Sequence, residues 1–316
     1  MSTNLTQSES AHGTKKDHLH RIRIGIQPTG WTNDDFPEIG DTIPYQQILD
    51  ETAKAGFEGG STGHNYPGHL PSLLHALEAR KLGITSTWVG TKFTAPNQYE
   101  QTIEYLKGQI AFLKAVRATD IVVAELASAA HQVRDKSVLD DRPIFNEPQW
   151  YLLTQGLNQA GKLASENGMR LSYHHHVGTG VQSRAEVDRL LKNTDPRYVS
   201  LCLDTGHLLF GGDDPVELAR DHIKRIGHVH LKDVRKKILD EVVPGKFSFY
   251  QAIMEGIFTV PGDPEGCIDF HPIFNTFLEN NYEGWIAVEA EQDPAKAPPL
   301  RSAQMAREFI RKNLGV

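Results

Sequence analysis

Short apolar runs alternate with longer amphipathic stretches along the chain from residue 22 to its end. The short runs are typical of buried strands, and the longer stretches repeat apolar residues at the spacing of a helix. We predict strands near residues 22–27, 58–62, 84–90, 120–126, 170–177, 199–205, 228–234 and 284–291. We predict helices at residues 45–55, 70–81, 99–117, 148–167, 185–192, 216–225, 272–279 and 299–313.

The strict alternation of eight strands with eight helices predicts a parallel (β/α)8 barrel of the TIM type. A chain of 316 residues with 39% hydrophobic content is long enough for such a barrel as one domain, which we place at residues 21–316. Glycines stand where left-handed caps would end helices, and prolines where helices would begin. These are Gly56, Gly83, Gly168, Pro44, Pro148, Pro215 and Pro272.

Two stretches, residues 128–148 and 235–270, fall outside this alternation. They follow the fourth and seventh predicted strands, so in a barrel both lie at the C-terminal rim, where long loops build active sites. The second stretch has apolar positions compatible with a short helix over the barrel mouth. We expect both stretches to act as lids, and an interface for a second subunit of a homo-oligomer is nearly as compatible with the second.

Residues 1–20 are polar and lack the apolar segment of a signal peptide or membrane anchor, so we predict a disordered tail. The net charge of −7, with both signs interspersed, provides no basic stripe for nucleic acid. The two cysteines, Cys202 and Cys267, are too few for a disulfide framework, and we expect both to be buried and inert. These features favour a protein of the reducing cytoplasm.

The candidate chemistry lies where the predicted strands end. The fifth strand ends in His174-His175-His176, the sixth in an Asp-Thr-Gly-His motif, and the seventh in His228-Val-His230. Side chains alternate faces along a strand, so His174 and His176 share one face, as do His228 and His230, while His175 turns toward the helices. Imidazoles and carboxylates meeting at one spot indicate a bound divalent cation, which would neutralise them.

We predict one metal ligand from each of four successive strands, namely His174, Asp204, His230 and Glu289. This mixed nitrogen and oxygen set suits manganese, cobalt or zinc better than magnesium or calcium. Glu291 has the same strand phase as Glu289 and is the alternative ligand.

Proton transfer needs further ionisable groups near the metal. His176 is a candidate acid, base or substrate contact, because two same-face residues of one strand lie ~6 to 7 Å apart and do not easily share an ion. Glu125, Lys232 and Glu291 are the other candidates. Burial and positive neighbours would depress the pKa of Lys232.

Other polar and aromatic groups at the same rim suit a polyhydroxylated ligand. Asn33 and Asp34 can bind hydroxyl groups, and Trp31 or Trp88 can stack on the carbon-bound face of a ring. His207 either orients Asp204 or binds substrate.

The ordered motifs of the chain resemble those of the inosose dehydratases. They are Gly30-Trp-Thr-Asn-Asp-Asp35, Tyr173-His-His-His-Val-Gly-Thr-Gly-Val-Gln182, Leu203-Asp-Thr-Gly-His207, His228-Val-His-Leu-Lys-Asp-Val-Arg235, Phe258-Thr-Val-Pro-Gly-Asp263, Cys267-Ile-Asp-Phe270 and Val288-Glu-Ala-Glu-Gln-Asp-Pro294. The resemblance spans residues 22–314 and implies a xylose isomerase-like barrel of the sugar isomerase/epimerase group. It further implies loss of water from 2-keto-myo-inositol to a trihydroxycyclohexane dione in inositol breakdown, with manganese or cobalt, and glutathione as an assay requirement.

The chain departs from the family pattern after the second strand, where a Gly-Thr-Glu-Val-Gly motif would place a Glu and this chain has Gly60-Ser-Thr-Gly63. The segment 85–90 also matches loosely. Both segments should face the substrate, so a related keto-sugar stays open as the substrate. An isomerase or epimerase on the same barrel is the alternative enzyme. A non-catalytic polyol sensor is disfavoured, because every metal-bearing strand end keeps its ionisable group.

Overall fold

The structure, a computed structural model, describes residues 22–316, so the predicted tail lies outside the described residues. Its main sheet is formed by β1 (Ile22–Ile26), β2 (Gly59–Gly60), β3 (Gly83–Ile84), β4 (Trp88–Thr91), β5 (Asp120–Glu125), β6 (Arg170–His174), β7 (Val199–Asp204), β8 (Ile226–Leu231) and β11 (Gly284–Val288). All paired neighbours in this sheet are parallel, in the order β3-β2-β1-β11-β8-β7-β6-β5-β4.

The sheet closes on itself through the chain, because its two end strands, β3 and β4, are separated only by residues 85–87. The Thr85 backbone N–H donates to the Gly60 carbonyl at 3.0 Å, and the Thr87 carbonyl accepts from Val122 at 3.1 Å. The third predicted strand is therefore two short pieces, each paired with a different neighbour. Counted as one, they complete the eight strands of the predicted barrel.

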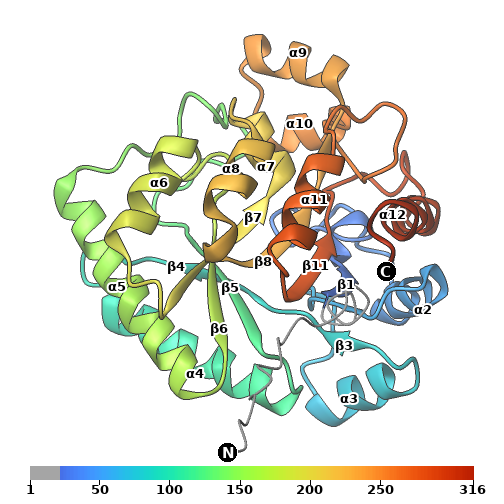
Figure 1. Cartoon of the computed structure of the whole chain (residues 1–316), viewed down its shortest axis with the longest axis horizontal. Helices are drawn as coiled ribbons and strands as arrows, with labels where there is room; N and C mark the ends of the chain where they lie inside the picture. The colour runs from blue at the N-terminus through green and yellow to red at the C-terminus, as the bar shows by residue number, and fades with distance from the viewer. Residues whose placement is uncertain (1–21) are drawn as a thin grey trace, which may run out of the picture.

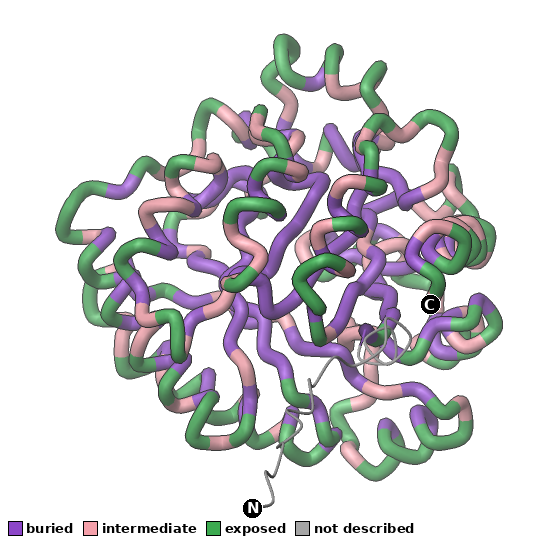
Figure 2. The backbone as a smooth tube through the Cα atoms, viewed as in Figure 1, coloured by how far each residue is buried: buried purple, intermediate pink, exposed green. Residues whose placement is uncertain are grey.

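Eight main helices surround the strands (Figure 1). They are α2 (Tyr45–Ala55), α3 (Leu70–Glu78), α4 (Tyr99–Ala115), α5 (Glu147–Glu166), α6 (Arg184–Asn193), α8 (Pro215–His222), α11 (His271–Glu279) and α12 (Pro299–Leu314). Figure 2 shows the strands buried along their length and the helices alternating between buried and exposed positions. This is the burial pattern that the sequence predicts for a barrel with an outer helical layer.

Most of the helix-boundary predictions are confirmed. Gly56 and Gly168 have φ of +87° and +76°, values that favour glycine. Pro148, Pro215 and Pro272 lie in the first turns of their helices, and Pro44 caps α2. The prediction for Gly83 is wrong, because that residue opens β3, and the positive φ of +56° falls on Lys81 instead.

The two stretches outside the alternation, residues 128–148 (the first insertion) and 235–270 (the second insertion), meet above the C-terminal ends of the strands. The second insertion follows β9 (Asp233–Val234) and contains α9 (Lys236–Gly245), α10 (Phe249–Glu255) and β10 (Phe258–Thr259). Helices α9 and α10 lie together at the top of Figure 1. The Val138 backbone N–H, in the first insertion, donates to the Phe247 carbonyl at 3.1 Å. The predicted short helix is α10, which packs the Phe249 ring 5.2 Å from that of His176.

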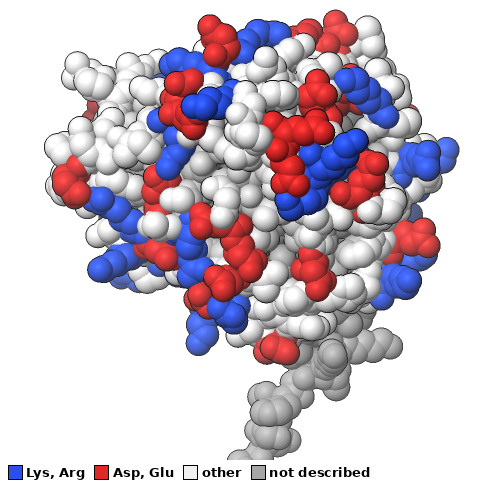
Figure 3. All heavy atoms as spheres, turned by 90° about the horizontal axis from the view of Figure 1, so that it is seen from above, with Lys and Arg blue, Asp and Glu red and all other residues white. Residues whose placement is uncertain are grey.

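Acidic and basic side chains are intermingled on the face shown in Figure 3. None of the helices from residue 22 onward has the length and apolarity needed to cross a lipid bilayer. Cys202 is buried as expected, but the prediction for Cys267 is wrong, because this residue is exposed. The prediction followed the general tendency of free cysteine to be buried. Cys267 instead lies on a rim loop, where its backbone N–H donates to Asp233 and its side chain is exposed.

Candidate active site

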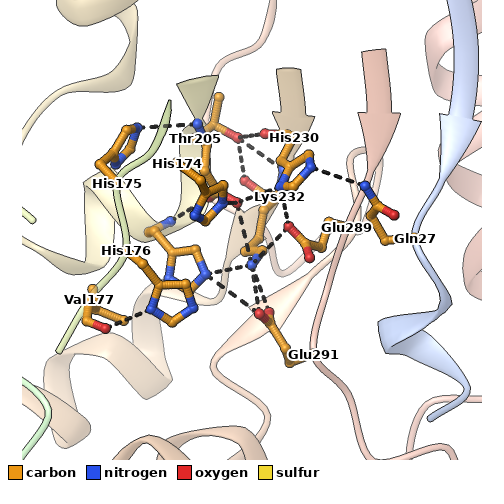
Figure 4. A network of polar contacts seen from close by, with 12 residues as sticks. Gln27, His174, His175, His176, Val177, Thr205, His230, Lys232, Glu289 and Glu291 are labelled. Carbon is orange, nitrogen blue, oxygen red and sulfur yellow. Dashed lines mark hydrogen bonds and ion pairs between the residues drawn. The ribbon is translucent and has the colours of Figure 1, made fainter. Parts of the chain in front are cut away.

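The four predicted ligands come together at the C-terminal ends of neighbouring strands. His174 ends β6, Asp204 ends β7, His230 lies in β8 and Glu289 directly follows β11. One ligand atom from each lies within 4.8 Å of those of the other three. Figure 4 shows the side chains of His174, His230 and Glu289 directed toward one another. Adjacent parallel strands therefore deliver residues distant in sequence to one point.

The detailed geometry of this cluster fits a shared cation. Asp204 Oδ2 lies 3.3 Å from His174 Nε2 and 3.7 Å from His230 Nδ1. Glu289 Oε2 lies only 2.6 Å from His230 Nδ1, yet neither atom has a hydrogen bond of normal geometry among the described residues. A ring nitrogen and a carboxylate oxygen this close together are both within reach of one ion, and the nitrogen and oxygen donors of the cluster suit a transition metal or zinc.

Neighbouring groups hold the ligands in place. Gln27 Nε2 lies 3.0 Å from His230 Nε2, the ring nitrogen that faces away from the cluster. Asp204 Oδ1 accepts from the His207 backbone N–H at 2.7 Å, which makes Asp204 the N-cap of the short helix α7 (Thr205–Phe210). Contacts of this kind fix the orientation of metal ligands. The bond from His207 occupies Oδ1 of Asp204 and leaves Oδ2 for the cluster.

Lys232 is the fixed cation of the site. Its Nζ lies 3.4 Å from both Asp204 and Glu289, and 2.8 Å and 2.9 Å from the two oxygens of Glu291. Burial lowers the pKa of Lys232, but the three carboxylates outweigh burial and raise that pKa above its usual value. The expectation of a depressed pKa is therefore wrong, because it counted positive neighbours and omitted the carboxylates.

The same ammonium group keeps Asp204 ionised. Burial raises the pKa of Asp204, but Lys232, His207 and the two contacting imidazoles together hold it well below the usual value. Asp204 is thus present as the carboxylate that a metal ligand must be.

A second cluster joins His176, His207 and Glu291, whose polar atoms also lie within 4.8 Å of one another. His176 Nδ1 lies 2.7 Å from the Val177 carbonyl, which can only accept, so Nδ1 carries the hydrogen and Nε2 keeps a lone pair. Burial, then His207, lowers the pKa of His176 well below its usual value, so the ring is neutral. Lys232 Nζ lies 2.8 Å from His207 Nε2 and already supplies a positive charge here.

A cavity of about 250 Å³ opens beside both clusters. One wall, here called the metal wall, carries His174, His176, His230, Glu289 and Glu291 at its surface, and it includes Asp204 and Lys232, which contact these side chains from behind. The facing residues, here called the loop wall, are Asn33, Asp34 and Asp35 after β1, Ser61 and Thr62 after β2, and Gln132 from the first insertion. Among the described residues that line the cavity, none is Lys or Arg.

Three of the predicted substrate contacts line this cavity: Asn33, Asp34 and Trp88. The Trp88 ring packs edge-on at 5.0 Å from His174. His207 lies behind the cavity lining, in contact with Lys232 and with its backbone bound to Asp204. Segments 60–63 and 85–90 both contribute lining residues, as expected from their positions after the second strand and on the third.

Trp31 and Glu125 do not line the cavity, and both predictions are corrected here. The turn η1 (Pro28–Gly30) directs Trp31 into the core, where its Nε1 donates to Glu51 at 2.6 Å. The Glu125 carboxylate accepts hydrogen bonds from the side chains and backbone of segment 91–94. Its neighbour Leu126 lines the cavity instead, so Glu125 points to the opposite side.

Sequence reasoning did not name Asp35 or Gln132 as substrate contacts, although both line the cavity. Gln132 lies in a long rim insertion, and Asp35 follows Asn33 and Asp34 in the loop after the first strand. Their positions at the C-terminal rim were a usable signal, although polar residues at such positions are also common turn formers.

Comparisons with known proteins agree with this geometry. The sequence model of the family described as xylose isomerase-like TIM barrel matches residues 49–313. The chain is 46% identical over 297 residues to the inosose dehydratase of Geobacillus thermodenitrificans, covering 94% of this chain and 99% of that protein. It is 45% identical over 296 residues to the inosose dehydratase of Clostridium tetani, covering 94% and 98%.

Two solved structures share the fold. An L-ribulose 3-epimerase superposes with a TM-score of 0.66 at 18% identity, covering 93% of this chain and 95% of that one. The IOLI protein, crystallised with a bound zinc atom, superposes with a TM-score of 0.70 at 14% identity, covering 93% and 98%. The matches in sequence and fold lead to one assignment: the chain belongs to the inosose dehydratases, within the xylose isomerase-like TIM barrels.

Proposed function

We propose that this protein is a metal-dependent hydro-lyase that removes water from a cyclic keto-polyol. The proposed substrate is 2-keto-myo-inositol (scyllo-inosose), and the product is a trihydroxycyclohexane-1,2-dione of inositol catabolism. The observation that carries the proposal is the four-residue cluster of His174, Asp204, His230 and Glu289 facing a hydroxyl-binding wall, in a chain 46% identical to an inosose dehydratase.

The charges of the cavity support a neutral substrate. Asp34, Asp35, Glu289 and Glu291 line it, and none of the described lining residues is a Lys or Arg that could neutralise a phosphate or carboxylate. Carboxylates and hydroxyls instead accept and donate hydrogen bonds to the hydroxyl groups of a polyol, and Trp88 provides an apolar contact for ring carbons. A phosphorylated sugar would be repelled by the carboxylates of Asp34, Glu289 and Glu291.

His174, Asp204, His230 and Glu289 would hold a divalent cation, which would supply electrophilic polarisation of a substrate ketone and so make the adjacent C–H more acidic. The protein must then remove a proton from that carbon. The proposed bases are His176, with a neutral ring and a lone pair on Nε2, and Glu291, whose carboxylate contacts the Lys232 ammonium group. Lys232 stays protonated and acts as a fixed positive charge near the developing enolate.

We propose manganese or cobalt as the resident metal, and zinc also fits the donor set. Glutathione is retained as an assay component from the family resemblance alone. A cytoplasmic location and assembly into a homo-oligomer complete the proposal.

The test is a turnover assay with 2-keto-myo-inositol on protein of known metal content. We expect a dehydrated dione, identified by mass and by NMR; a product of unchanged mass would instead support the isomerase or epimerase alternative. His176→Gln should lower turnover about 10²- to 10⁴-fold with metal content unchanged. His222→Gln, which alters a histidine paired with Asp188 on the outer helices, should leave turnover intact. Full activity in the His176 variant would remove that residue from the mechanism.

A further inference from the structure

One carboxyl group of the cavity is held by the first insertion rather than by the metal wall. Asp35 lines the cavity, and its Oδ1 accepts a hydrogen bond from Gln132 Nε2 at 2.7 Å. The same oxygen lies 3.7 Å from Nε2 of His131. The backbone N–H of Asp35 donates to Asn33 Oδ1 at 2.9 Å, and this bond fixes the loop. Oδ1 is thus occupied by the insertion, and among the described residues no partner is recorded for Oδ2.

The imidazole beside Asp35 does not act as a cation. His131 is fully buried, its ring lies 4.5 Å from that of His176, and neither ring nitrogen has a hydrogen-bond partner among the described residues. Burial lowers the pKa of His131, so the ring is neutral. Burial raises the pKa of Asp35, Glu291 and Asp34 add to the rise, and the contacts with His131 and Gln132 only partly oppose it.

Glu291, in the same cavity, has the opposite environment. Both of its carboxylate oxygens lie within 2.9 Å of the Lys232 ammonium group. Asp35 has an amide and a neutral ring in place of that ammonium group. Two carboxyl groups with such different partners in one cavity are suited to different roles, one as a base and one as an acid.

We propose that Asp35, held in place by the hydrogen bond from Gln132, protonates the hydroxyl group that leaves the substrate. This assignment rests on the proposed dehydratase function. In the step, the electron pair of the enolate forms the new carbon–carbon double bond while the adjacent C–O bond breaks. The departing oxygen keeps that bonding pair and takes the carboxyl proton of Asp35, so water leaves and Asp35 becomes a carboxylate. Solvent returns the proton before the next turnover.

The test uses two substrates, the keto-polyol and an analogue with fluorine in place of the leaving hydroxyl group. Asp35→Asn keeps an oxygen that can accept from Gln132 but lacks the carboxyl proton. We expect water loss to fall about 10²- to 10⁴-fold, and fluoride release, which needs no proton donor, to stay within a few-fold of wild type. Equal loss of both reactions, or loss of neither, would overturn the assignment.

Glu38→Gln is the matched control. Glu38 lies on the same loop and pairs with Arg134 of the same insertion, but it is exposed and outside the cavity lining. Both reactions should therefore keep their wild-type rates in this variant. Binding of the ketone to Asp35→Asn, measured by calorimetry, should change only a few-fold, which excludes a collapsed cavity as the cause.

The positioning role of Gln132 has its own readout. Gln132→Ala should slow water loss about 10-fold, the effect of one hydrogen bond, while fluoride release is unchanged. An equal fall with both substrates would assign Gln132 to folding or binding instead.

If the wild-type protein releases no water from any keto-polyol, the dehydratase function itself fails. If it does and Asp35→Asn dehydrates at full rate, only the role of Asp35 fails.

Discussion

The two walls of the cavity are built in different ways. The metal wall comes from the ends of β6, β7, β8 and β11, so its side chains are fixed by strand pairing and lie almost completely buried. The loop wall comes from turns after β1 and β2 and from an insertion after β5, and it is more open to solvent. The side chain of Asp34 is 51% exposed, whereas that of Asp204 is 0% exposed.

This difference separates two tasks. Groups that must meet one ion within a fraction of an ångström lie on strands, where backbone hydrogen bonds fix their positions. Groups that bind hydroxyls lie on loops, whose sequence can change without disturbing the barrel. The segment Gly60-Ser-Thr-Gly63, where the resemblance leads us to expect a Glu, contributes Ser61 and Thr62 to the loop wall, so we expect this departure to affect substrate choice rather than metal binding.

The largest effect is expected from removing a charge from the metal wall. Asp204→Asn keeps the cap to the His207 backbone but loses the carboxylate oxygen directed at the cluster. In metalloproteins, losing a residue that only hydrogen-bonds to a metal ligand typically weakens metal binding about 10- to 100-fold. Loss of a ligand itself should therefore weaken metal binding at least about 100-fold, and turnover should fall in parallel. Metal analysis after dialysis measures this. Asp188→Asn, on the outer face of the barrel, is the control, and full metal content in Asp204→Asn would contradict the assigned site.

The second test concerns the buried ammonium group of the metal wall. Lys232→Met leaves Asp204, Glu289 and Glu291 without their shared cation, which should lower the free energy of unfolding of the metal-free protein by about 3–5 kcal/mol. Urea denaturation in the presence of a chelator measures the change. Lys236→Met removes an exposed lysine paired with Asp240 and should cost less than about 1 kcal/mol. Equal effects of the two substitutions would show that Lys232 does not neutralise this wall.

A smaller effect is expected on the loop wall. One oxygen of Asp34 already accepts from the backbone and ring of His64, at 2.9 Å and 2.8 Å. Asp34→Asn weakens a charged hydrogen bond to a substrate hydroxyl, so kcat/KM should fall about 10- to 100-fold, mainly through KM, with metal content unchanged. Steady-state kinetics with Asp41→Asn, an exposed residue of the same loop, as control would check this. A loss of metal from Asp34→Asn would contradict the proposal that the metal wall binds the ion and the loop wall binds only the substrate.

The smallest effect is expected on the pH dependence of stability. It concerns Asp233, which lies between the metal wall and the second insertion. Burial raises the pKa of Asp233 to about 6, although three backbone N–H groups donate to its carboxylate. Between pH of about 4 and 6 the folded protein then holds a proton that the unfolded chain releases, so this group adds stability as pH falls. In Asp233→Asn, the slope of unfolding free energy against pH in that range should become more positive by up to about 1.4 kcal/mol per pH unit. An unchanged slope in urea titrations would place the pKa near its ordinary value.

The sequence by itself determined the barrel and the residues of the metal wall. Alternation of strands with helices predicts the architecture, and alternation of faces along each strand places His174, Asp204 and His230 on one side. Both are local periodicities, so they can be read without knowing what packs against what. The pairing of β3 and β4 with different neighbours is not local, and the sequence predicted one continuous strand there.

For β5, only the tertiary structure showed which face of the strand is directed to the inside. Every residue of β5 is buried, so no polar side reveals that Glu125 points toward segment 91–94 and Leu126 toward the cavity. The tertiary structure also places Glu289 and Glu291, which share a phase, in different clusters. The protonation of Lys232 and Asp35 depends on carboxylates and rings brought from distant elements, because electrostatic interactions act through space and the sequence records only neighbours along the chain.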